Sequence, residues 1–397
     1  MKSLFFLFPV LCISAFVQGA YAQQTAARPM GFMAGVDVSE MAKLQQHGAV
    51  YKLDGVPLDP FKIFRQDGVN WMRVRLFVDP SGEGPLCNDL PYTLKLAREI
   101  KAQGFRLLLD FHYSDTWADP SQQMTPKAWA GLSHDQLVLK VKSYTRDTLR
   151  SFAAVNAAPD MVEIGNEITN GMLWPDGRVS PASTDKLQWA HFTDLVKAGS
   201  EGARDSGPVA KRPLILIHVD RGGDVKASQL FYDHLCAAGV PFDVIGLSDY
   251  PWWQGSLYDL KTNLNELAER YGKPIVVVET AFPYVPQSME KDGQVYKGKD
   301  AVDHVLHYPP SPEGQAEYLR QMTDVVRSIP NQLGIGMFYW AAAWVKTDGW
   351  GAPSWSHDWE ERALFNADGD ALPALKALGE AAAPQDSKKL GNPSGAQ

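Results

Sequence analysis

The sequence predicts a single (β/α)8 TIM barrel with long loops at the carboxyl ends of its strands. Three observations support this prediction: eight short runs are apolar and rich in β-branched residues, helical patterns separate the runs, and nothing suggests a second domain. Runs that are apolar throughout are typical of parallel strands buried on both faces. We expect strands at 32–39, 69–78, 105–113, 161–167, 214–220, 243–250, 275–280 and 336–344.

The segments between the expected strands carry apolar residues at helical spacing. The clearest helical patterns lie at 94–102, 137–152 and 316–329. The strands are spaced unevenly, and long loops follow the third, fourth, seventh and eighth. In a barrel of this class, these loops form the face on which a ligand binds.

The N-terminus has the pattern of a secretory signal peptide at residues 1–22. A basic start at Lys2 precedes an apolar run at 4–17 and the cleavage motif Ala20-Tyr21-Ala22. The run is too short to span a membrane, and no other segment qualifies. We therefore expect a secreted or periplasmic protein with no stable membrane insertion after cleavage.

Composition divides the rest of the chain into three parts. Residues 23–31 have the character of a linker, and 32–380 form the barrel domain. Residues 381–397 contain Pro, Ser, Lys, Gly and Gln without an apolar period, so we expect a disordered tail. Two cysteines remain after signal cleavage, Cys87 in an expected loop and Cys236 on an expected helix. Pairing needs close Cα atoms, and we favour free thiols.

Charge and composition narrow the partners. The formal net charge is −8, and no basic stripe is visible, which argues against nucleic acid as a partner. A neutral polysaccharide is compatible with this mild acidity. The chain has 12 Trp and 14 Tyr; most of them will pack in the core, but rings exposed over a cleft suit the C–H faces of sugars. We expect a monomer.

Two glutamates each stand at the carboxyl end of an expected strand. Glu167 ends the fourth strand, and Glu279 lies near the end of the seventh. Active sites of such barrels lie on this face. Two carboxylates there are the minimum for hydrolysing a glycosidic bond: one protonates the leaving oxygen, and the other attacks the anomeric carbon or activates water. The alternative is that each pairs with an arginine for stability.

The proposed nucleophile is Glu279, which must stay ionised and therefore needs donors nearby. Arg73 and Arg75 lie two positions apart on the second strand, so they share one face. We expect Arg75, which is nearer the rim, to be the partner of Glu279. The hydroxyl of Tyr250, at the end of the sixth strand, is a second candidate donor.

Polar and aromatic side chains gather at the ends of several expected strands. The segment 111–120 is the densest of these groups. A lone histidine at a strand end is more often structural, so a structural role for His218 stays open beside a binding role. Besides Arg75 and Tyr250, the expected substrate-binding residues are His112, Asp115, Trp117, Asn166, His218 and Trp340.

At these residues the chain resembles the arabinogalactan endo-β-1,4-galactanases, family 53 of the glycoside hydrolases. The segment 111–120 is the most specific part of the resemblance, which covers almost the whole barrel. The matching stretches are 35–39, 73–78, 111–120, 165–171, 218–224, 278–280, 338–340, 363–365 and 372–375.

The resemblance implies a secreted, endo-acting, retaining hydrolase on a (β/α)8 barrel. It implies that Glu167 is the acid/base, that Glu279 is the nucleophile and that the substrate is the β-1,4-galactan or arabinogalactan side chains of pectin. Two alternatives stay open. One is another endo-β-glycanase of the same barrel type, such as a mannanase or glucanase, and the other is a non-catalytic glycan-binding barrel.

The chain departs from the family pattern at two places. Asp249 stands where an aromatic residue is usual, and it would either alter a subsite or pair with an arginine. The loop at 288–310 lacks the closely spaced aspartates of calcium-binding members, because Asp292, Asp300 and Asp303 do not obviously converge. Calcium needs six to eight oxygen ligands, so we expect no metal and no cofactor.

Overall fold

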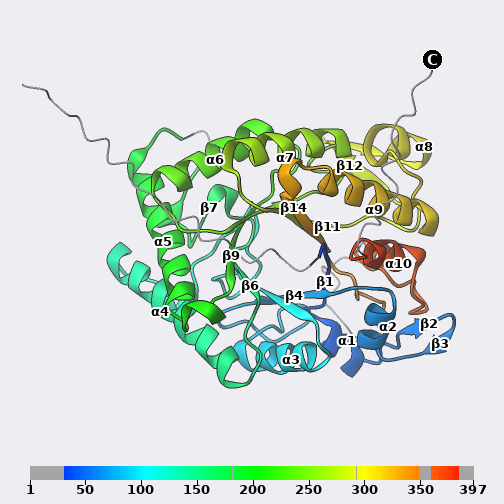
Figure 1. The fold of residues 1–397 in the computed structure, drawn as a ribbon, viewed down its shortest axis with the longest axis horizontal. Helices are drawn as coiled ribbons and strands as arrows, with labels where there is room; N and C mark the ends of the chain where they lie inside the picture. The colour runs from blue at the N-terminus through cyan, green and yellow to red at the C-terminus, as the bar shows by residue number, and fades with distance from the viewer. Residues whose placement is uncertain (1–30, 181–182, 292, 348–358, 384–397) are drawn as a thin grey trace, which may run out of the picture. The chain divides into compact units, whose positions relative to one another are not determined.

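The computed structural model describes residues 31–180, 183–291, 293–347 and 359–383. Within these residues, eight parallel strands form a closed barrel (Figure 1). Each of the eight predicted strands is confirmed, and the (β/α)8 fold class with them. The barrel strands are β1 (Met33–Asp37), β4 (Trp71–Leu76), β5 (Arg106–Phe111), β6 (Met161–Ile164), β9 (Leu214–Val219), β10 (Val244–Ser248), β11 (Ile275–Thr280) and β14 (Gly334–Tyr339).

Helices surround the barrel on its outside (Figure 1). The three helices predicted most clearly from spacing are confirmed as α3, α4 and α9. The α-helices of the described residues are α1 (Met41–Gln46), α2 (Pro60–Gln66), α3 (Leu90–Ala102), α4 (His134–Ala154), α5 (Lys186–Arg204), α6 (Val225–Ala237), α7 (Leu257–Tyr271), α8 (Gly298–Ala301), α9 (Pro312–Arg327) and α10 (Pro373–Glu380).

Local sequence explains where several helices begin. The long helix α4 starts at a capping box, in which the Ser133 side chain accepts from the backbone N–H of Gln136 and the Gln136 side chain accepts from the backbone N–H of Ser133. Helix α7 starts in the same way with Ser256 and Asp259. In both cases, side chains satisfy N–H groups that the first turn of a helix leaves without partners.

The loops on the carboxyl side of the strands contain small elements of their own. One antiparallel hairpin follows β6, and another follows β11. The short strands are β2 (Lys52–Leu53), β3 (Val56–Pro57), β7 (Gly171–Met172), β8 (Gly177–Arg178), β12 (Met289–Lys291) and β13 (Gln294–Tyr296), and the short helical turns are η1 (Lys127–Trp129), η2 (Ile168–Asn170), η3 (Val209–Lys211), η4 (Val302–Leu306), η5 (Pro330–Gln332) and η6 (Glu360–Arg362).

An apolar layer fills the lower part of the barrel. It draws one side chain from each of seven strands and two from β11, and it is separate from the larger core between the strands and the helices. Gly35 on β1 makes room in this layer, because a Cβ at this position would lie 2.1 Å from the ring of Phe338. The layer consists of Met33, Trp71, Leu108, Met161, Leu216, Val244, Val276, Val278 and Phe338.

A polar layer lies above the apolar one. Alternate residues of a strand share a face, so Arg73 points into the barrel as Trp71 does. The same offset of two residues places Asp110, Glu163 and His218 inside the barrel on neighbouring strands, and all of them are buried. The apolar layer therefore ends below the carboxyl ends of the strands, and the space there belongs to charged and polar groups.

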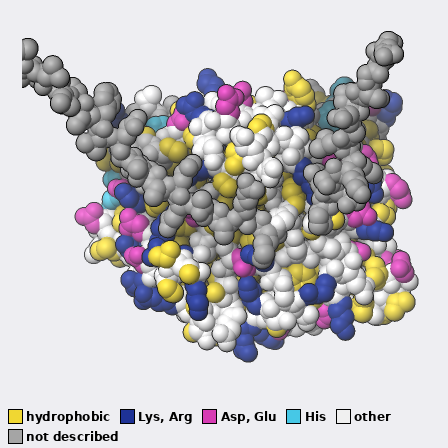
Figure 2. All heavy atoms as spheres, viewed as in Figure 1, with side chains coloured by type: hydrophobic (Ala, Val, Ile, Leu, Met, Phe, Trp, Pro, Cys, Tyr) yellow, Lys and Arg dark blue, Asp and Glu magenta, His cyan; other side chains and the backbone are white. Residues whose placement is uncertain are grey.

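The surface and the chain ends bear on other predictions. On the face shown in Figure 2, basic and acidic side chains are interspersed and hydrophobic ones form small separate groups. Among the described residues, no helix combines the length and apolarity needed to cross a membrane.

The predicted free thiols are confirmed for Cys87 and Cys236. The predicted signal peptide and most of the linker and tail lie outside the described residues, although Arg327 donates to the carbonyls of Ala381 and Ala383.

Candidate active site

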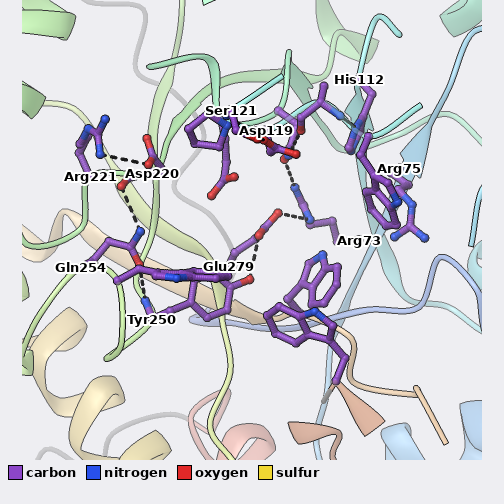
Figure 3. Close-up of a pocket in the computed structure, with 18 residues that line it drawn as sticks. Arg73, Arg75, His112, Asp119, Ser121, Asp220, Arg221, Tyr250, Gln254 and Glu279 are labelled. Carbon is purple, nitrogen blue, oxygen red and sulfur yellow. Dashed lines mark hydrogen bonds and ion pairs between the residues drawn. The ribbon is translucent and has the colours of Figure 1, made fainter. Parts of the chain in front are cut away.

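A cavity of about 580 Å³ opens at the carboxyl ends of the barrel strands (Figure 3). It is lined by both glutamates singled out in the sequence, Glu167 and Glu279. The other predicted site residues that line it are Arg75, His112, Trp117, Asn166, Tyr250 and Trp340. The site residues therefore come from strands far apart in sequence, as expected for a barrel whose strands all end on one face.

Glu167 is carried by a tight turn after β6. The strand ends at Ile164, and Gly165 and Glu167 both have positive φ angles, of 83° and 44°. A positive φ is unfavourable for a residue with a Cβ, and residues strained in this way cluster at functional sites. The turn aims the half-buried Glu167 side chain into the cavity instead of continuing the strand.

The environment of Glu167 favours its protonated form. Its pKa is raised well above the usual range, first by burial and then by the negative charges of Glu279 and Asp220. The Ser248 hydroxyl, which lies 2.6 Å from Glu167 Oε1 and donates to it, opposes the shift only in part. A general acid requires this protonated form.

Glu279 faces the cavity because β11 contains a bulge. The strand carries one extra residue, between Val277 and Thr280, relative to both neighbouring strands. Val278 belongs to the apolar layer inside the barrel, and the next residue, Glu279, also points inward. Thr280 turns outward, where its hydroxyl meets that of Tyr318 at 3.0 Å. Simple alternation would have turned Glu279 away from the cavity.

Two donors fix the Glu279 carboxylate. Arg73 Nη1 lies 2.9 Å from Oε1, and the Tyr250 hydroxyl donates to Oε2 at 2.8 Å (Figure 3). The prediction that Tyr250 donates to Glu279 is confirmed. Glu279 is only 6% exposed, so these two donors and the neighbouring strands enclose it almost completely. Arg73 thus balances the negative charge of Glu279, and each carboxylate oxygen is held by one donor.

Arg73 is the centre of the polar layer. Its guanidinium donates to Glu163 at 2.6 and 3.0 Å, to Asp37 and Asp110 at 3.1 Å each, and to Asn166 at 2.9 Å. Burial alone would raise the pKa of Glu163, but the charge of Arg73 holds it at about 2. Burial, reinforced by the charge of Glu163, raises the pKa of Asp110 to about 8. The layer therefore shifts the pKa values of two neighbouring carboxyls in opposite directions.

The prediction that Arg75 pairs with Glu279 is wrong. Arg75 instead forms an ion pair with Glu40, donates to the carbonyl of Pro85 at 3.2 Å, and lies 4.3 Å from the ring of Trp117. In Figure 3, Arg75 lies away from Glu279, and Arg73 lies between them. Arg73, which lies two residues deeper in the barrel on the same strand, contacts Glu279 instead. It does so because Glu279 projects from the bulge into the barrel and not upward from the rim.

Two of the predicted sugar-binding residues do not line the cavity. Asp115 accepts from the backbone N–H groups of Asp79 and Lys127 and thus ties two loops together. His218 is fully buried, with Nδ1 at 3.1 Å from Glu163 and Nε2 at 2.8 Å from the Ser248 hydroxyl. For both residues the structural role replaces the predicted contact with substrate. His218 holds in place the serine that donates to Glu167.

His112 and Asn166 line the cavity and are held rigidly. His112 lies 3.0 Å from Asp110 through Nε2, and its Nδ1 accepts from the backbone N–H of Ala118 at 3.1 Å. Burial and the charges of Arg75 and Arg73 lower its pKa to about 3, so the ring is neutral. Asn166 donates to the carbonyl of Ala118 at 2.8 Å. Their contact with a sugar stays a prediction.

The structure adds site residues that the sequence reasoning missed. Trp253 and Trp359 line the cavity beside the predicted Trp340, whose ring centroid lies 4.2 Å from that of Trp359. Trp253 is 61% exposed. The signal was present in the pair Trp252-Trp253, three residues past the sixth strand. Asp119, Asp220, Arg221 and Gln254 also line the cavity, as does Arg73, which the sequence offered only as an alternative to Arg75.

The two departures noted in the sequence have different outcomes. Asp249 is buried, and neither of its carboxylate oxygens has a hydrogen-bond partner among the described residues. It lines no part of the cavity described above and pairs with no described arginine, so the structure supports neither of the two roles suggested for it. Burial raises its pKa well above the usual range. Of the aspartates in the loop after the seventh strand, Asp292 lies outside the described residues, and Asp303 pairs with Lys299.

The fold and the site together define a glycoside hydrolase of the barrel type. The profile of Glycosyl hydrolase family 53 matches residues 33–378. The chain belongs to this family, as its resemblance in sequence implied.

Relatives and solved structures agree with this assignment. A probable arabinogalactan endo-β-1,4-galactanase A of Aspergillus terreus is 40% identical over 326 residues, covering 80% of this chain and 87% of that protein. The catalytic domain of a family 53 protein from Ignisphaera aggregans superposes with a TM-score of 0.78 at 38% identity, covering 89% and 96% of the two chains. A fungal β-1,4-galactanase structure gives 0.74 at 32% identity, covering 87% and 98%.

Proposed function

We propose that this protein is an endo-acting β-1,4-galactanase that cleaves arabinogalactan with retention of configuration. The observation that carries the proposal is that Glu167 and Glu279 line one cavity in opposite environments. Glu167 has a raised pKa, whereas Glu279 pairs with Arg73 and accepts a hydrogen bond from the Tyr250 hydroxyl. A pair of carboxyl groups with different environments is the arrangement in which one serves as acid and the other as nucleophile. The names of the family 53 relatives support galactan as the substrate.

In the proposed mechanism, Glu279 attacks the anomeric carbon while Glu167 gives its proton to the departing glycosidic oxygen. This step forms a covalent glycosyl-enzyme and releases one end of the chain. Glu167, now ionised, takes a proton from water, and the resulting oxygen nucleophile releases the sugar from Glu279. Two inversions at one carbon give net retention.

The shape of the site supports cleavage within a polymer. The central cavity shares Pro120 and Ser121 with a neighbouring hollow of about 630 Å³ on one side. It shares Trp253, Gln254 and two further residues with a hollow of about 460 Å³ on another side. Hollows that share lining residues with the central cavity give room for a substrate chain longer than one sugar.

Substrate digestion and paired variants test this proposal. Linear β-1,4-galactan should yield oligosaccharides of intermediate length early in the reaction, whereas mannan, xylan and cellulose should yield little product. Release of only mono- or disaccharide from one end would contradict endo action, and preference for mannan or glucan would indicate the rival specificity. Binding without product would indicate a non-catalytic glycan-binding barrel.

The two glutamates can be told apart by substitution. Glu279→Ala should lose nearly all activity on every substrate, because no covalent intermediate forms. Glu167→Ala should lose much less activity on aryl galactosides with good leaving groups, since these need little protonation. Equal losses on both kinds of substrate would overturn the assignment of acid and nucleophile.

We also propose that the protein is exported and acts on the galactan side chains of pectin. The basic start, apolar run and Ala20-Tyr21-Ala22 motif of the N-terminus support export. Mass spectrometry of the protein recovered outside the cytoplasm should show a chain that begins after Ala22. An uncleaved N-terminus would contradict the proposal.

A further inference from the structure

Two histidines and an aspartate converge outside the central cavity, where Asp176 and His191 line the neighbouring hollow. His134 is the first residue of α4, His191 lies on α5, and Asp176 lies in the turn between β7 and β8. His134 Nδ1 lies 2.8 Å from one oxygen of Asp176, and His191 Nδ1 lies 3.2 Å from the other. The two imidazole rings stack with centroids 3.9 Å apart and planes 14° apart.

This geometry gathers the ligand types that a transition metal prefers. One atom from each residue can be chosen so that all three lie within 4.8 Å of one another. Ligands of a tetrahedral zinc ion stand roughly 3.4 Å apart, given metal–ligand distances of about 2.0–2.2 Å. Rotation of the side chains would have to bring the two nitrogens and one oxygen from their present spacing to these distances. Two imidazoles with one carboxylate suit zinc and not calcium or magnesium, which take oxygen ligands.

A second carboxylate, that of Asp194, lies near the other nitrogen of the His134 ring. His134 Nε2 lies 3.6 Å from Asp194 Oδ2, on the side of the ring opposite Asp176. Histidines that bind metals commonly direct their other nitrogen to a carboxylate, which orients the ring and increases its basicity. The three ligand side chains are 19–31% exposed, so the ion can enter and water can complete the coordination.

We propose that His134, Asp176 and His191 form a binding site for Zn²⁺, with water as the fourth ligand and Asp194 orienting His134. The prediction of no metal rests only on the lack of calcium ligands in the loop after the seventh strand. The site on α4, α5 and the β7–β8 hairpin lies in a different part of the fold (Figure 1).

The bound ion would join three elements next to the active site. Asp176 lies two residues after Trp174, whose backbone N–H donates to the carbonyl of Gln123 at 2.6 Å. The Gln123 side chain in turn donates to the carbonyl of Asn166, the residue before Glu167, at 2.8 Å. A metal at Asp176 therefore anchors the hairpin to the two helices and stabilises the wall beside the acid/base, without contacting substrate in the central cavity.

Calorimetric titration with ZnCl₂ tests the proposal on tag-free protein treated with a chelator. The wild type should bind one Zn²⁺ per chain, and saturating Zn²⁺ should raise its Tm. His191→Ala and Asp176→Asn should each weaken this binding at least 100-fold and abolish the rise in Tm. Asp194→Asn should weaken it roughly 10–100-fold, the usual effect of losing a residue that orients a metal ligand.

Matched controls separate this site from general binding to surface histidines. His304 is exposed on η4, which directly follows α8, and α8 lies on the far side of the barrel from α4 and α5 (Figure 1). His304→Ala should therefore bind Zn²⁺ as the wild type does. Circular dichroism should show that each variant is folded, and Co²⁺ should give visible absorption bands in the wild type that are lost in His191→Ala. Wild-type protein without a Zn²⁺ isotherm, or folded Asp176→Asn and His191→Ala with unchanged isotherms, would overturn the proposal.

Discussion

Arg73 Nη1 lies 2.9 Å from Glu279 Oε1, at the point where the buried ionic layer of the barrel meets the cavity. Arg73 is 1% exposed, and it also holds Glu163, Asp37 and Asp110. A buried guanidinium without such partners would be very costly. The proposed nucleophile is thus one member of a network that also stabilises the fold, so its position depends on residues that never touch substrate.

Arg73→Lys should damage catalysis and stability together. Lysine keeps the charge but cannot make the several directed contacts of the planar guanidinium. We expect kcat to fall about 10²-fold or more and the free energy of unfolding to fall by about 3–5 kcal/mol, as when a buried ionic network loses a partner. Urea denaturation and galactan kinetics measure the two effects. Arg75→Lys should keep a kcat at least tenfold higher than Arg73→Lys; the reverse order would contradict the pairing.

Tyr250→Phe should reduce turnover without unfolding the protein. The change removes a hydrogen bond of 2.8 Å to Glu279 and leaves the ring in place. A hydrogen bond to a charged group contributes about 1.5–3 kcal/mol, which corresponds to a fall in kcat of roughly 10–150-fold. Tyr339→Phe is the matched control, because the Tyr339 hydroxyl donates to the carbonyls of Phe282 and Arg362. The control should lower Tm and leave kcat nearly unchanged.

The alkaline limb of the pH profile should move when Asp220 loses its charge. Asp220 raises the pKa of Glu167, which must be protonated to act as the acid, so activity is lost as pH rises through this pKa. Asp220→Asn lowers the pKa of Glu167 and should shift the alkaline limb of kcat/KM to lower pH. Asp115→Asn is the control, because Asp115 is not among the charges with the largest effect on the pKa of Glu167. A shift to higher pH in Asp220→Asn would contradict the assignment.

The sequence was sufficient for the strands and for the two glutamates. Each barrel strand is a short apolar run. Such runs are the expected pattern of parallel strands, because these strands are buried on both faces. Because all such strands end on one face, Glu167 and Glu279 could be placed near each other before any distance was known. Tyr250 could be placed beside Glu279 by the same reasoning, because it follows the neighbouring strand.

The errors arose where strand register decides the contact. Arg73 and Arg75 share one face, but which of them meets Glu279 depends on the stagger between strands and on the bulge at Val278. Nothing in the apolar run 275–278 marks the extra residue. The sequence could not decide between a structural and a substrate-binding role for His218. Burial by neighbouring strands, and not its position at a strand end, keeps it from the cavity. Such contacts depend on tertiary packing, which spacing along one segment does not record.

Trp253→Ala should weaken binding of long substrates and leave the chemical step intact. Trp253 is 61% exposed at the cavity wall, where its ring can stack on a sugar. Aromatic stacking contributes about 0.5–1.5 kcal/mol, so KM for galactan should rise roughly 2–12-fold with kcat nearly unchanged, the result of losing equal binding of ground and transition states. Tyr258→Ala is the control, because Tyr258 is 77% exposed on α7 but does not line the cavity. A fall in kcat at constant KM would instead assign Trp253 to the support of Tyr250, whose ring centroid lies 5.3 Å from its own.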